Sequence, residues 1–379
     1  MLYNDFKGLK ISALGMGAMR LPTKGDYENV DQDKLEEIVA YAMENGVNYY
    51  DSGWDYHGGN SEGLLAKALS NYPRDSYSYA TKFPGYDTKN FGKVEEIFEE
   101  QLKRTGLDHF DFYLLHNVCE LNINQFLNGE TYHTVEYLLK MKEEGKITHF
   151  GFSSHGNPNT VRRFLDKYGD YMEFCQLQVN WLDWEFQKTR QKYEICTERG
   201  LPVISMEPLR GGKLVNRLSD EDLAKMRELR PDITPVEWSF RFIQGIPNIL
   251  TVLSGFSELG QVKENIETFK ESKPLNEQER QLLLDIAKRM TTLGAVPCTS
   301  CRYCASHCPQ HLDIPWLIEL YNEDSFSGGG FIAPMAIGGL PEDRRPEACI
   351  SCKSCEEVCP QGIEVSVVLK KLVERIKDR

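Results

Sequence analysis

The sequence predicts an α/β protein in which a (β/α)8 barrel is followed by a smaller, mostly helical, cysteine-rich domain. Two observations lead to this prediction. Short β-forming runs alternate with helical patterns between residues 13 and 255, and eight of the 11 cysteines lie within residues 298–359. The predicted boundaries are 1–275 for the barrel, 276–296 for a connector helix and 297–379 for the small domain.

Each predicted strand is a short run in which apolar, β-branched and aromatic residues dominate. The eight runs are residues 13–20, 47–52, 77–82, 110–116, 149–154, 174–180, 202–208 and 249–255. Between them, apolar residues recur at the helical spacing of three and four in residues 32–45, 61–71, 93–105, 132–144 and 188–199. This order, over about 250 residues, is typical of a (β/α)8 barrel.

A doubly wound sheet is the alternative with the same order of elements. In that fold a glycine fingerprint follows the first strand and opens a helix. Here Gly15 and Gly17 lie inside the first predicted strand, not in a turn after it. The barrel is therefore favoured.

The composition narrows the class of protein. A chain of 379 residues with 41% hydrophobic content is long and apolar enough for a large core. Its net charge of −13 argues against nucleic acid or an anionic membrane as the main partner. Residues 1–17 lack the apolar run of a signal peptide, and no stretch of about 18 apolar residues predicts a membrane span. We expect a cytoplasmic protein.

Polar side chains stand at the ends of three successive predicted strands. Asp51 ends the second strand, Lys82 the third and His116 the fourth, while Tyr56 follows in the loop after the second. Because the carboxyl ends of barrel strands meet at one mouth, we expect these four side chains to lie together. Alone, each fits an ordinary structural role, such as a solvated rim charge or a cap. The hypothesis of a catalytic site rests on their joint placement.

These residue types suit proton donation to a carbonyl oxygen. An ammonium group on Lys82 favours a phenolate, so we expect it to lower the pKa of Tyr56 from about 10. Asp51 would neutralise Lys82 and keep it charged. Tyr56 would then give its proton to a carbonyl oxygen as hydride arrives at carbon, and His116 would orient the same oxygen.

The eight clustered cysteines form two runs with the same spacing, C-x2-C-x2-C-x3-C-P. In proteins with two 4Fe-4S clusters, three cysteines of such a run bind one cluster and the fourth reaches the other. The predicted ligands are Cys298, Cys301, Cys304 and Cys359 for the first cluster, and Cys349, Cys352, Cys355 and Cys308 for the second. Zinc is the alternative, but zinc ribbons use paired C-x2-C knuckles. The other three cysteines, Cys119, Cys175 and Cys196, are expected to be buried small hydrophobes.

The segment between the two cysteine runs is long for a compact ferredoxin. It contains a helical pattern near residues 316–321, and the region resembles the helical ferredoxin modules that are fused to oxidoreductases. The last helical pattern, at residues 364–377, carries an apolar stripe that we expect to pack on the small domain or the barrel, with a partner surface as the alternative. The stripe consists of Val365, Val368, Leu369, Leu372 and Ile376.

Residues 9–269 resemble the aldo-keto reductase family. The resemblance is carried by DSGWDY at 51–56, GGNSE at 58–62, GFSS at 151–154 and GFS at 255–257, together with the Asp, Tyr, Lys and His set. It implies reduction of an aldehyde or ketone with NADPH or NADH, with Tyr56 as proton donor and no metal at the chemical step. The implied partner is a small-molecule carbonyl substrate.

The same resemblance implies a set of cofactor contacts. Ser153, Ser154 and Gln178 would hold the nicotinamide carboxamide, with Met206 beside the ring. The turns after the seventh and eighth strands would hold the phosphates, and Gln261 and Asn265 would lie near the adenosine. The implied turn residues are Leu209, Gly211, Gly255, Phe256 and Ser257.

Three features depart from the usual pattern of the family. Ser154 replaces a common Asn, and Met206 replaces a common aromatic residue. Gly255 and Gln261 stand where NADPH-selective members often carry Lys and Arg, which weakens the preference for NADPH over NADH. Arg210 and Lys263 are candidates to compensate, although a surface role fits them equally.

Three functions remain open from the sequence. The first, and favoured, is a carbonyl reductase accompanied by two electron-transfer clusters. The second is a ferredoxin-like electron-transfer module whose barrel binds a nucleotide without carbonyl turnover and which meets a redox protein partner. The third is a regulatory or assembly subunit. The sequence does not identify the substrate, the role of a flavin or the oligomeric state.

Overall fold

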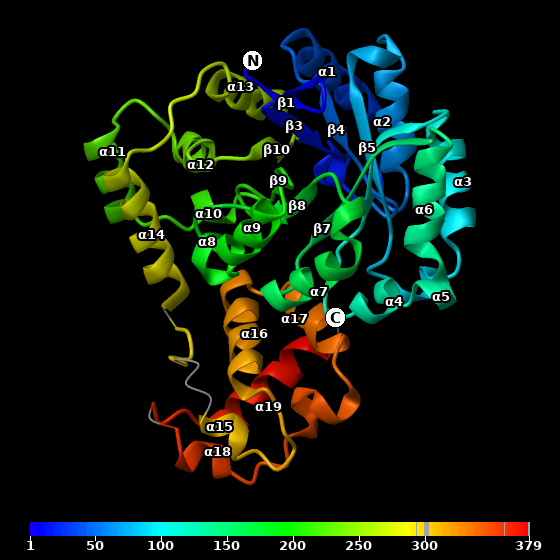
Figure 1. Ribbon diagram of the computed structural model, residues 1–379. Helices are drawn as coiled ribbons and strands as arrows, with labels where there is room; N and C mark the ends of the chain where they lie inside the picture. Colours follow the sequence, from blue (N-terminus) through cyan, green and yellow to red (C-terminus); the bar gives the residue numbers. More distant parts are fainter. Residues whose placement is uncertain (293, 299–302, 360, 378–379) are drawn as a thin grey trace. The chain divides into compact units, whose positions relative to one another are not determined.

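Eight parallel strands form a closed barrel in the computed structural model (Figure 1). The model describes residues 1–292, 294–298, 303–359 and 361–377. The barrel order is β10-β3-β4-β5-β6-β7-β8-β9. The bounds are β3 (Leu14–Gly17), β4 (Tyr49–Asp51), β5 (Ser78–Phe83), β6 (Phe110–Leu115), β7 (Ile147–Ser154), β8 (Cys175–Gln178), β9 (Val203–Met206) and β10 (Ile249–Gly255). The predicted (β/α)8 barrel is confirmed, and Gly15 and Gly17 do lie in the first barrel strand.

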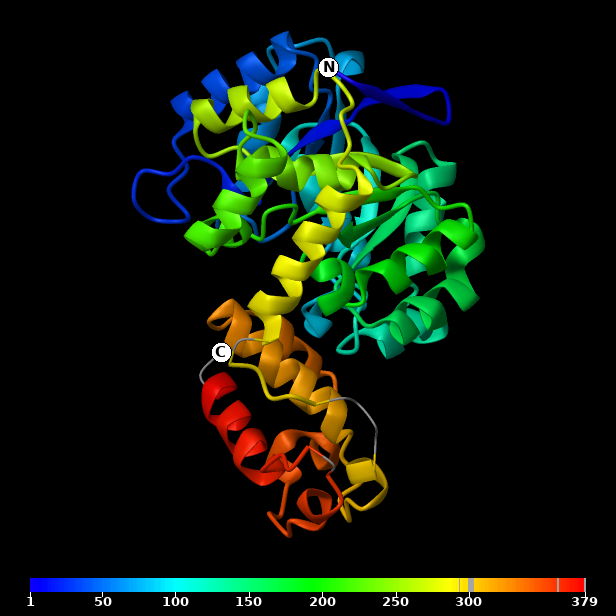
Figure 2. The same cartoon turned by 90° about the vertical axis from the view of Figure 1, so that its left-hand side faces the viewer.

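Helices surround the strands on the outside of the barrel (Figures 1 and 2). The longer ones are α1 (Gln32–Glu44), α2 (Ser61–Leu69), α3 (Val94–Thr105), α6 (Thr134–Glu143), α7 (Pro158–Tyr168), α9 (Thr189–Glu198), α11 (Asp220–Leu229), α12 (Pro235–Gln244) and α13 (Leu259–Thr268). Short helices in the loops are α4 (Ile123–Leu127), α5 (Gly129–Tyr132), α8 (Asp183–Phe186) and α10 (Lys213–Asn216).

Local sequence explains where several of these helices begin and end. Asp31 and Asn157 accept hydrogen bonds from backbone N–H groups in the first turns of α1 and α7. Thr234 does the same for α12, which has proline at its first position. Gly106 ends α3 in the left-handed region, where glycine costs least. These caps set the first residues of α1, α7 and α12 and the last residue of α3.

A two-stranded hairpin that the sequence did not predict closes the amino-terminal end of the barrel. It consists of β1 (Tyr3–Phe6) and β2 (Leu9–Ser12), the dark blue strands in Figure 2. Asn4 Nδ2 donates to the carbonyl of Leu250 at 2.8 Å, and the Phe6 ring lies 5.5 Å from that of Phe112. Phe112 belongs to the barrel core, with Leu114 and Ile204. The opposite end, where the strands terminate, therefore remains as the mouth.

The chain divides into two compact units. The first comprises residues 1–118 and 124–284, and the second comprises 119–123 and 285–379. The division falls inside α14 (Glu277–Thr292), the helix predicted as a connector. No helix in the described part of the chain is long and apolar enough to cross a membrane.

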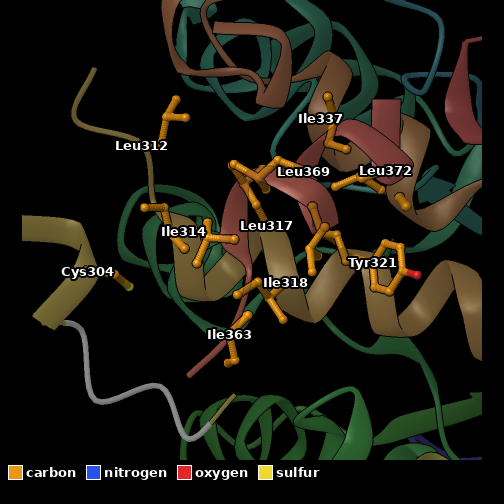
Figure 3. Packing of buried hydrophobic residues seen from close by; sticks show 14 of the residues in the cluster. Cys304, Leu312, Ile314, Leu317, Ile318, Tyr321, Ile337, Ile363, Leu369 and Leu372 are labelled. Carbon is orange, nitrogen blue, oxygen red and sulfur yellow. The ribbon is translucent and has the colours of Figure 1, made fainter. Parts of the chain in front are cut away.

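The second unit has a hydrophobic core of its own. Its described residues after α14 contain helices and no strand, as expected for a helical ferredoxin module: α15 (Tyr303–Ser306), α16 (Ile314–Ser327), α17 (Ile332–Gly338), α18 (Ser354–Glu357) and α19 (Val365–Ile376), with short 3-10 turns at Glu342–Arg344 and Pro346–Ala348. Leu317 and Ile318 of α16 lie near Leu369 and Leu372 of α19 (Figure 3). All five residues of the predicted apolar stripe are buried, so the packing prediction for this helix is confirmed.

Candidate active site and cysteine sites

The structure brings the four predicted catalytic side chains together at the mouth of the barrel. Asp51 is the last residue of β4, Lys82 lies near the end of β5, and His116 follows β6 directly. Tyr56 comes from the loop between β4 and α2. Because β4, β5 and β6 are neighbours in the barrel, their carboxyl ends present these groups side by side.

A buried ion pair lies at the centre of this group. Lys82 Nζ donates to Asp51 Oδ1 at 2.6 Å, and the two side chains are only 1% and 4% exposed. Lys82 also donates to the carbonyl oxygen of Ser52. The Lys82 nitrogen lies 5.1 Å from the centre of the Tyr56 ring, and Tyr56 Oη lies 3.4 Å from His116 Nε2. The two charges are thus enclosed, while the half-buried phenol and imidazole face the mouth.

The ion pair keeps Lys82 protonated. Burial alone would lower the pKa of Lys82, but Asp51 and Tyr56 raise it above its ordinary value. Burial raises the pKa of Asp51, and the ammonium group of Lys82 opposes that rise. The site therefore holds a fixed positive charge next to a phenol.

The predicted direction of the Tyr56 pKa shift is wrong. Burial raises the pKa of Tyr56 above its ordinary value, and the lowering effect of Lys82 only partly offsets this. Asp51 and Glu207 add to the rise, because a nearby negative charge disfavours a phenolate. Tyr56 therefore keeps its proton at neutral pH and can donate it.

His116 is neutral in this environment. Burial, together with the charge of Lys82 and the nearby His155, lowers the pKa of His116 well below 6.5. Its Nδ1 has no hydrogen-bond partner among the described residues. A neutral imidazole with one nitrogen near Tyr56 can orient an oxygen atom at the mouth without adding a charge.

A second buried carboxylate supports the site from behind, and it was not predicted as a site residue. Glu62, in α2, accepts hydrogen bonds from Thr81 Oγ1 at 2.5 Å and from Gln101 Nε2 at 2.7 Å. Gln101 Nε2 also donates to the carbonyl of Lys82 at 3.0 Å. The network fixes the strand segment that carries Lys82. Glu62 could have been noticed in the sequence, because it ends the GGNSE segment that carries part of the family resemblance.

The predicted carboxamide residues lie at the ends of β7 and β8. Ser153 Oγ accepts from the backbone N–H of Asn117 at 2.8 Å, and Ser154 Oγ donates to the carbonyl of Val118 at 2.6 Å. Gln178 Nε2 donates to Asp183 Oδ2 at 2.6 Å. Ser153, Ser154 and Gln178 are all buried, and these bonds fix their orientation.

Asp183 and Arg210 form a buried ion pair that links the loops after β8 and β9. Arg210 donates through Nε to Asp183 Oδ2 at 2.8 Å and through Nη2 to Oδ1 at 2.6 Å, with side-chain exposures of 6% and 0%. Two parallel bonds of this kind are strong and directional. The alternative of a solvated-surface role for Arg210 is therefore wrong, because its guanidinium is buried against a carboxylate.

The turns after β9 and β10 form the region predicted to hold the cofactor phosphates. Met206 ends β9, and the following turn has left-handed backbone angles at Glu207 (φ 53°), Arg210 (φ 46°) and Gly211 (φ 63°). Left-handed residues in a turn direct backbone N–H groups toward a common side, where an anion fits. Leu209, half-buried, lies in the same turn.

The second turn is held by short polar contacts. The backbone N–H of Ser257 donates to Gln261 Oε1 at 3.2 Å, and Ser257 Oγ donates to the carbonyl of Arg20 at 2.9 Å. Phe256 is fully buried beneath it, and Gly255 ends β10. Asn265 lies further along, where its Nδ2 donates to Ser254 Oγ at 3.0 Å. Gly211 and Gly255, one in each turn, both lie against the side chain of Arg20, so a cation stands beside the turns that were predicted to hold the phosphates.

The four cysteines predicted for the second cluster line one pocket. Three of them, Cys349, Cys352 and Cys355, come from the second run and Cys308 comes from the first. The remaining lining is largely apolar, from residues such as Leu312, Ile314 and Leu369. Burial raises the pKa of the Cys355 thiol to about 11, and Glu356 and the neighbouring Cys308 and Cys349 contribute to this rise.

The cysteines predicted for the first cluster lie only partly within the described residues. Cys304 is buried, Cys298 and Cys359 pack half-buried against the core of the second unit, and Cys301 lies outside the described residues. Within the described ranges, no three His, Cys, Asp or Glu side chains are arranged to hold a single metal ion. A 4Fe-4S cluster places each thiolate on a different iron, so four thiols around an apolar pocket fit it.

Comparisons with known proteins agree with the geometry of both units. The family model described as "Aldo/keto reductase family" matches residues 13–287, and that described as "4Fe-4S dicluster domain" matches 297–364. An uncharacterized oxidoreductase of Bacillus subtilis (strain 168) is 24% identical over 310 residues, which cover 74% of this chain and 94% of that protein.

Solved structures show the same barrel. An aldo-keto reductase from Bacillus halodurans in its holo form is 25% identical, with a TM-score of 0.60 over 76% of this chain and 95% of that one. An aldo-keto reductase from Klebsiella pneumoniae in complex with NADPH is 19% identical, with a TM-score of 0.60 over 76% of this chain and 96% of that one.

The fold and the mouth of the barrel define an oxidoreductase enzyme. The chain belongs to the Aldo/keto reductase family, and it carries a 4Fe-4S dicluster domain after the barrel.

The Asp183–Arg210 pair gives a test of the loop architecture. Asp183→Asn removes the carboxylate charge that the buried Arg210 contacts through two nitrogens, and we expect it to lower the free energy of unfolding of the barrel by about 3–5 kcal/mol. Urea unfolding followed by tryptophan fluorescence measures this change.

Two control variants separate the buried pair from charge effects in general. Glu185→Gln removes one carboxylate of the exposed Glu185–Arg190 pair and should cost at most about 1 kcal/mol. The double variant Asp183→Asn, Arg210→Met should recover part of the loss, because it leaves no buried charge and keeps an oxygen that accepts from Gln178. A single variant as stable as wild type would contradict the assignment.

Proposed function

We propose that the barrel reduces an aldehyde or ketone with NADPH or NADH, and that Tyr56 donates the proton. The observation that carries this proposal is the enclosed Lys82–Asp51 pair beneath a protonated phenol, 5.1 Å from its ring centre. An alcohol is formed from a carbonyl when hydride reaches carbon and a proton reaches oxygen. The reduced nicotinamide supplies the hydride when it is bound.

The residues of the chain divide the remaining work. His116, which is neutral, orients the carbonyl oxygen toward Tyr56 Oη. As negative charge develops on that oxygen, Tyr56 transfers its proton, and the ammonium group of Lys82 stabilises the phenolate that remains. Asp51 keeps Lys82 charged throughout. Ser153, Ser154 and Gln178 are proposed to hold the carboxamide, Met206 to contact the ring, and Gln261 and Asn265 to hold the adenosine end.

Tyr56→Phe tests the proton donor. We expect kcat/KM for carbonyl reduction to fall by about 10²–10⁴-fold, the usual contribution of a general acid, while the affinity for NADPH and NADH stays within about threefold. Steady-state assays on a panel of aldehydes and ketones measure the first, and fluorescence titration the second.

Tyr86→Phe is the matched control. The Tyr86 ring lies 5.0 Å from that of His116, but its hydroxyl donates to Asp55 and not toward Lys82. It should therefore lose much less activity than Tyr56→Phe. Equal losses in both variants, or full turnover by Tyr56→Phe, would remove Tyr56 from the proposed role.

The pH dependence follows from the directions of the pKa shifts. The pKa of His116 is lowered well below 6.5, so this residue is already neutral above pH 6 and adds no inflection there. The pKa values of Tyr56 and Lys82 are both raised, so both groups stay protonated through neutral pH. We expect kcat/KM for reduction to be flat between about pH 6 and 8 and to fall only at alkaline pH.

The measurement is a pH profile with a carbonyl substrate that does not titrate. His116→Gln should lower the whole profile without changing its shape. An acidic limb near pH 6.5 that disappears in His116→Gln would show that His116 titrates and acts as a charged group.

We further propose that the cysteines hold two 4Fe-4S clusters, with Cys308 and Cys359 each completing the cluster of the other run. The support is the shared pocket of Cys308 with Cys349, Cys352 and Cys355. The clusters transfer single electrons when assembled. Their proposed partner is a redox protein outside this chain.

Pairs of substitutions test this exchange of ligands. Two clusters correspond to about eight iron atoms per chain, and we expect Cys308→Ser and Cys355→Ser each to lose about four. The double variant Cys308→Ser, Cys355→Ser should lose no more than either single variant, because both residues serve one cluster. Cys304→Ser combined with Cys308→Ser should lose both clusters.

Iron and sulfide counts on anaerobically purified protein measure the outcome. Cys196→Ala, which changes a buried cysteine of the barrel, is the control and should keep all of the iron. If Cys304→Ser with Cys308→Ser retains about four iron atoms while Cys308→Ser with Cys355→Ser loses all, each run binds its own cluster.

A further inference from the structure

Arg20 lies between the two turns that are proposed to hold the cofactor phosphates. It ends the short 3-10 helix Ala18–Arg20 that follows β3, and β3 is the barrel neighbour of β10. Its carbonyl accepts a hydrogen bond from Ser257 Oγ at 2.9 Å, which ties its backbone to the turn after β10. Arg20 was not predicted as a site residue, although a cation directly after a barrel strand is at the mouth.

The Arg20 side chain extends from one turn to the other. Its Cβ lies 3.2 Å from the position that a side chain on Gly255 would occupy. Its guanidinium nitrogens lie 3.1 and 3.3 Å from the corresponding position on Gly211. Gly211 adopts φ 63°, so both the backbone conformation and the available space favour glycine there. The two turns therefore leave room for this cation.

The partner of the guanidinium is a carboxylate at the same mouth. Arg20 Nη1 lies 2.9 Å from Glu207 Oε1, and the side chains are 43% and 19% exposed. An ion pair that is open to solvent on one side contributes little net stability. A diphosphate carries more negative charge than Glu207, and two oxygens of a phosphate can accept two parallel hydrogen bonds from one guanidinium. It is therefore a stronger partner for Arg20 than the carboxylate is.

We infer that Arg20 binds the diphosphate of the nicotinamide cofactor across the two turns, and that Glu207 holds the arginine in place while the cofactor is absent. This inference rests on the proposed use of NADPH or NADH. Since the guanidinium lies at Gly211 and not at Gln261, Arg20 serves the diphosphate and not the 2′-phosphate of NADPH.

Fragments of the cofactor test the inference directly. Anaerobically purified full-length protein is titrated calorimetrically with ADP-ribose, which carries the diphosphate, and with adenosine, which does not. Arg20→Met should weaken ADP-ribose binding about 10- to 100-fold and leave adenosine binding within about threefold. Arg20→Lys should restore part of the affinity, since it keeps the charge but not the paired donors.

Further variants separate a direct contact with the diphosphate from a general loss of positive charge. Lys24→Met removes a cation from the same loop, where Lys24 pairs with Asp31, and should leave ADP-ribose binding unchanged. Glu207→Gln should tighten ADP-ribose binding several-fold, because the competing carboxylate is gone. Arg20→Met should weaken NADH and NADPH binding by the same factor.

The outcomes that overturn the inference differ from those that overturn the proposed function. Wild-type affinity of Arg20→Met for ADP-ribose would remove Arg20 from the diphosphate site, and so would a loss confined to NADPH. If Arg20→Met does not fold, unchanged ADP-ribose binding by both Arg20→Lys and Glu207→Gln would do the same. If the wild-type protein binds neither NADH nor NADPH, the proposed function fails, and this inference fails with it.

Discussion

The chemistry that we propose for the barrel mouth depends on the buried ion pair of Lys82 and Asp51. Two charges that are almost completely enclosed are costly to desolvate, and they persist because each is the counter-charge of the other. Their spacing is set by the barrel itself: Asp51 pairs with Ala80 of β5 in the register of the sheet, and Lys82 pairs with Leu114 of β6. Buried ion pairs are poor sources of net stability. The reason to keep this one is the fixed ammonium group that it places beside a phenol.

The effect of that ammonium group is to limit a pKa shift that burial causes. Tyr56 is enclosed enough for its pKa to rise, which keeps the proton in place before the carbonyl arrives. Without Lys82 the phenol would be a weaker acid still, and with Lys82 exposed to water the same charge would be screened. The proposed proton donation therefore needs two features together. Enclosure keeps the proton on Tyr56, and the buried ammonium group of Lys82 stabilises the phenolate that forms when the proton leaves. The hydrogen bonds of Glu62 and Gln101 behind Lys82 hold the strand at the distance that this balance requires.

The sequence predicted the eight strands and the meeting of Asp51, Lys82, Tyr56 and His116 because strand order alone decides which side chains share a mouth. It did not predict the direction of the Tyr56 pKa shift, since the depth of burial depends on how the loops fold over the site. The hairpin of residues 3–12 was missed because its strands are only four residues long and rich in polar side chains. A surface role stayed open for Arg210 because its partner Asp183 lies 27 residues earlier, and nothing local in the sequence indicates that the two loops meet. In general, contacts set by strand order were predictable and contacts between loops were not.

The functions that we propose for the two units transfer electrons in different ways. The carbonyl reduction that we propose balances with one hydride and one proton. Hydride brings both electrons to carbon, the proton proposed to come from Tyr56 reaches oxygen, and no single electron is left over. A 4Fe-4S cluster transfers one electron at a time. The structure gives each process a hydrophobic core of its own, around Phe112 and Ile204 in the barrel and around Leu317 and Leu372 in the helical unit. The carbonyl reduction that we propose therefore needs no electron from the proposed clusters, and electrons that pass through the clusters would belong to a separate half-reaction.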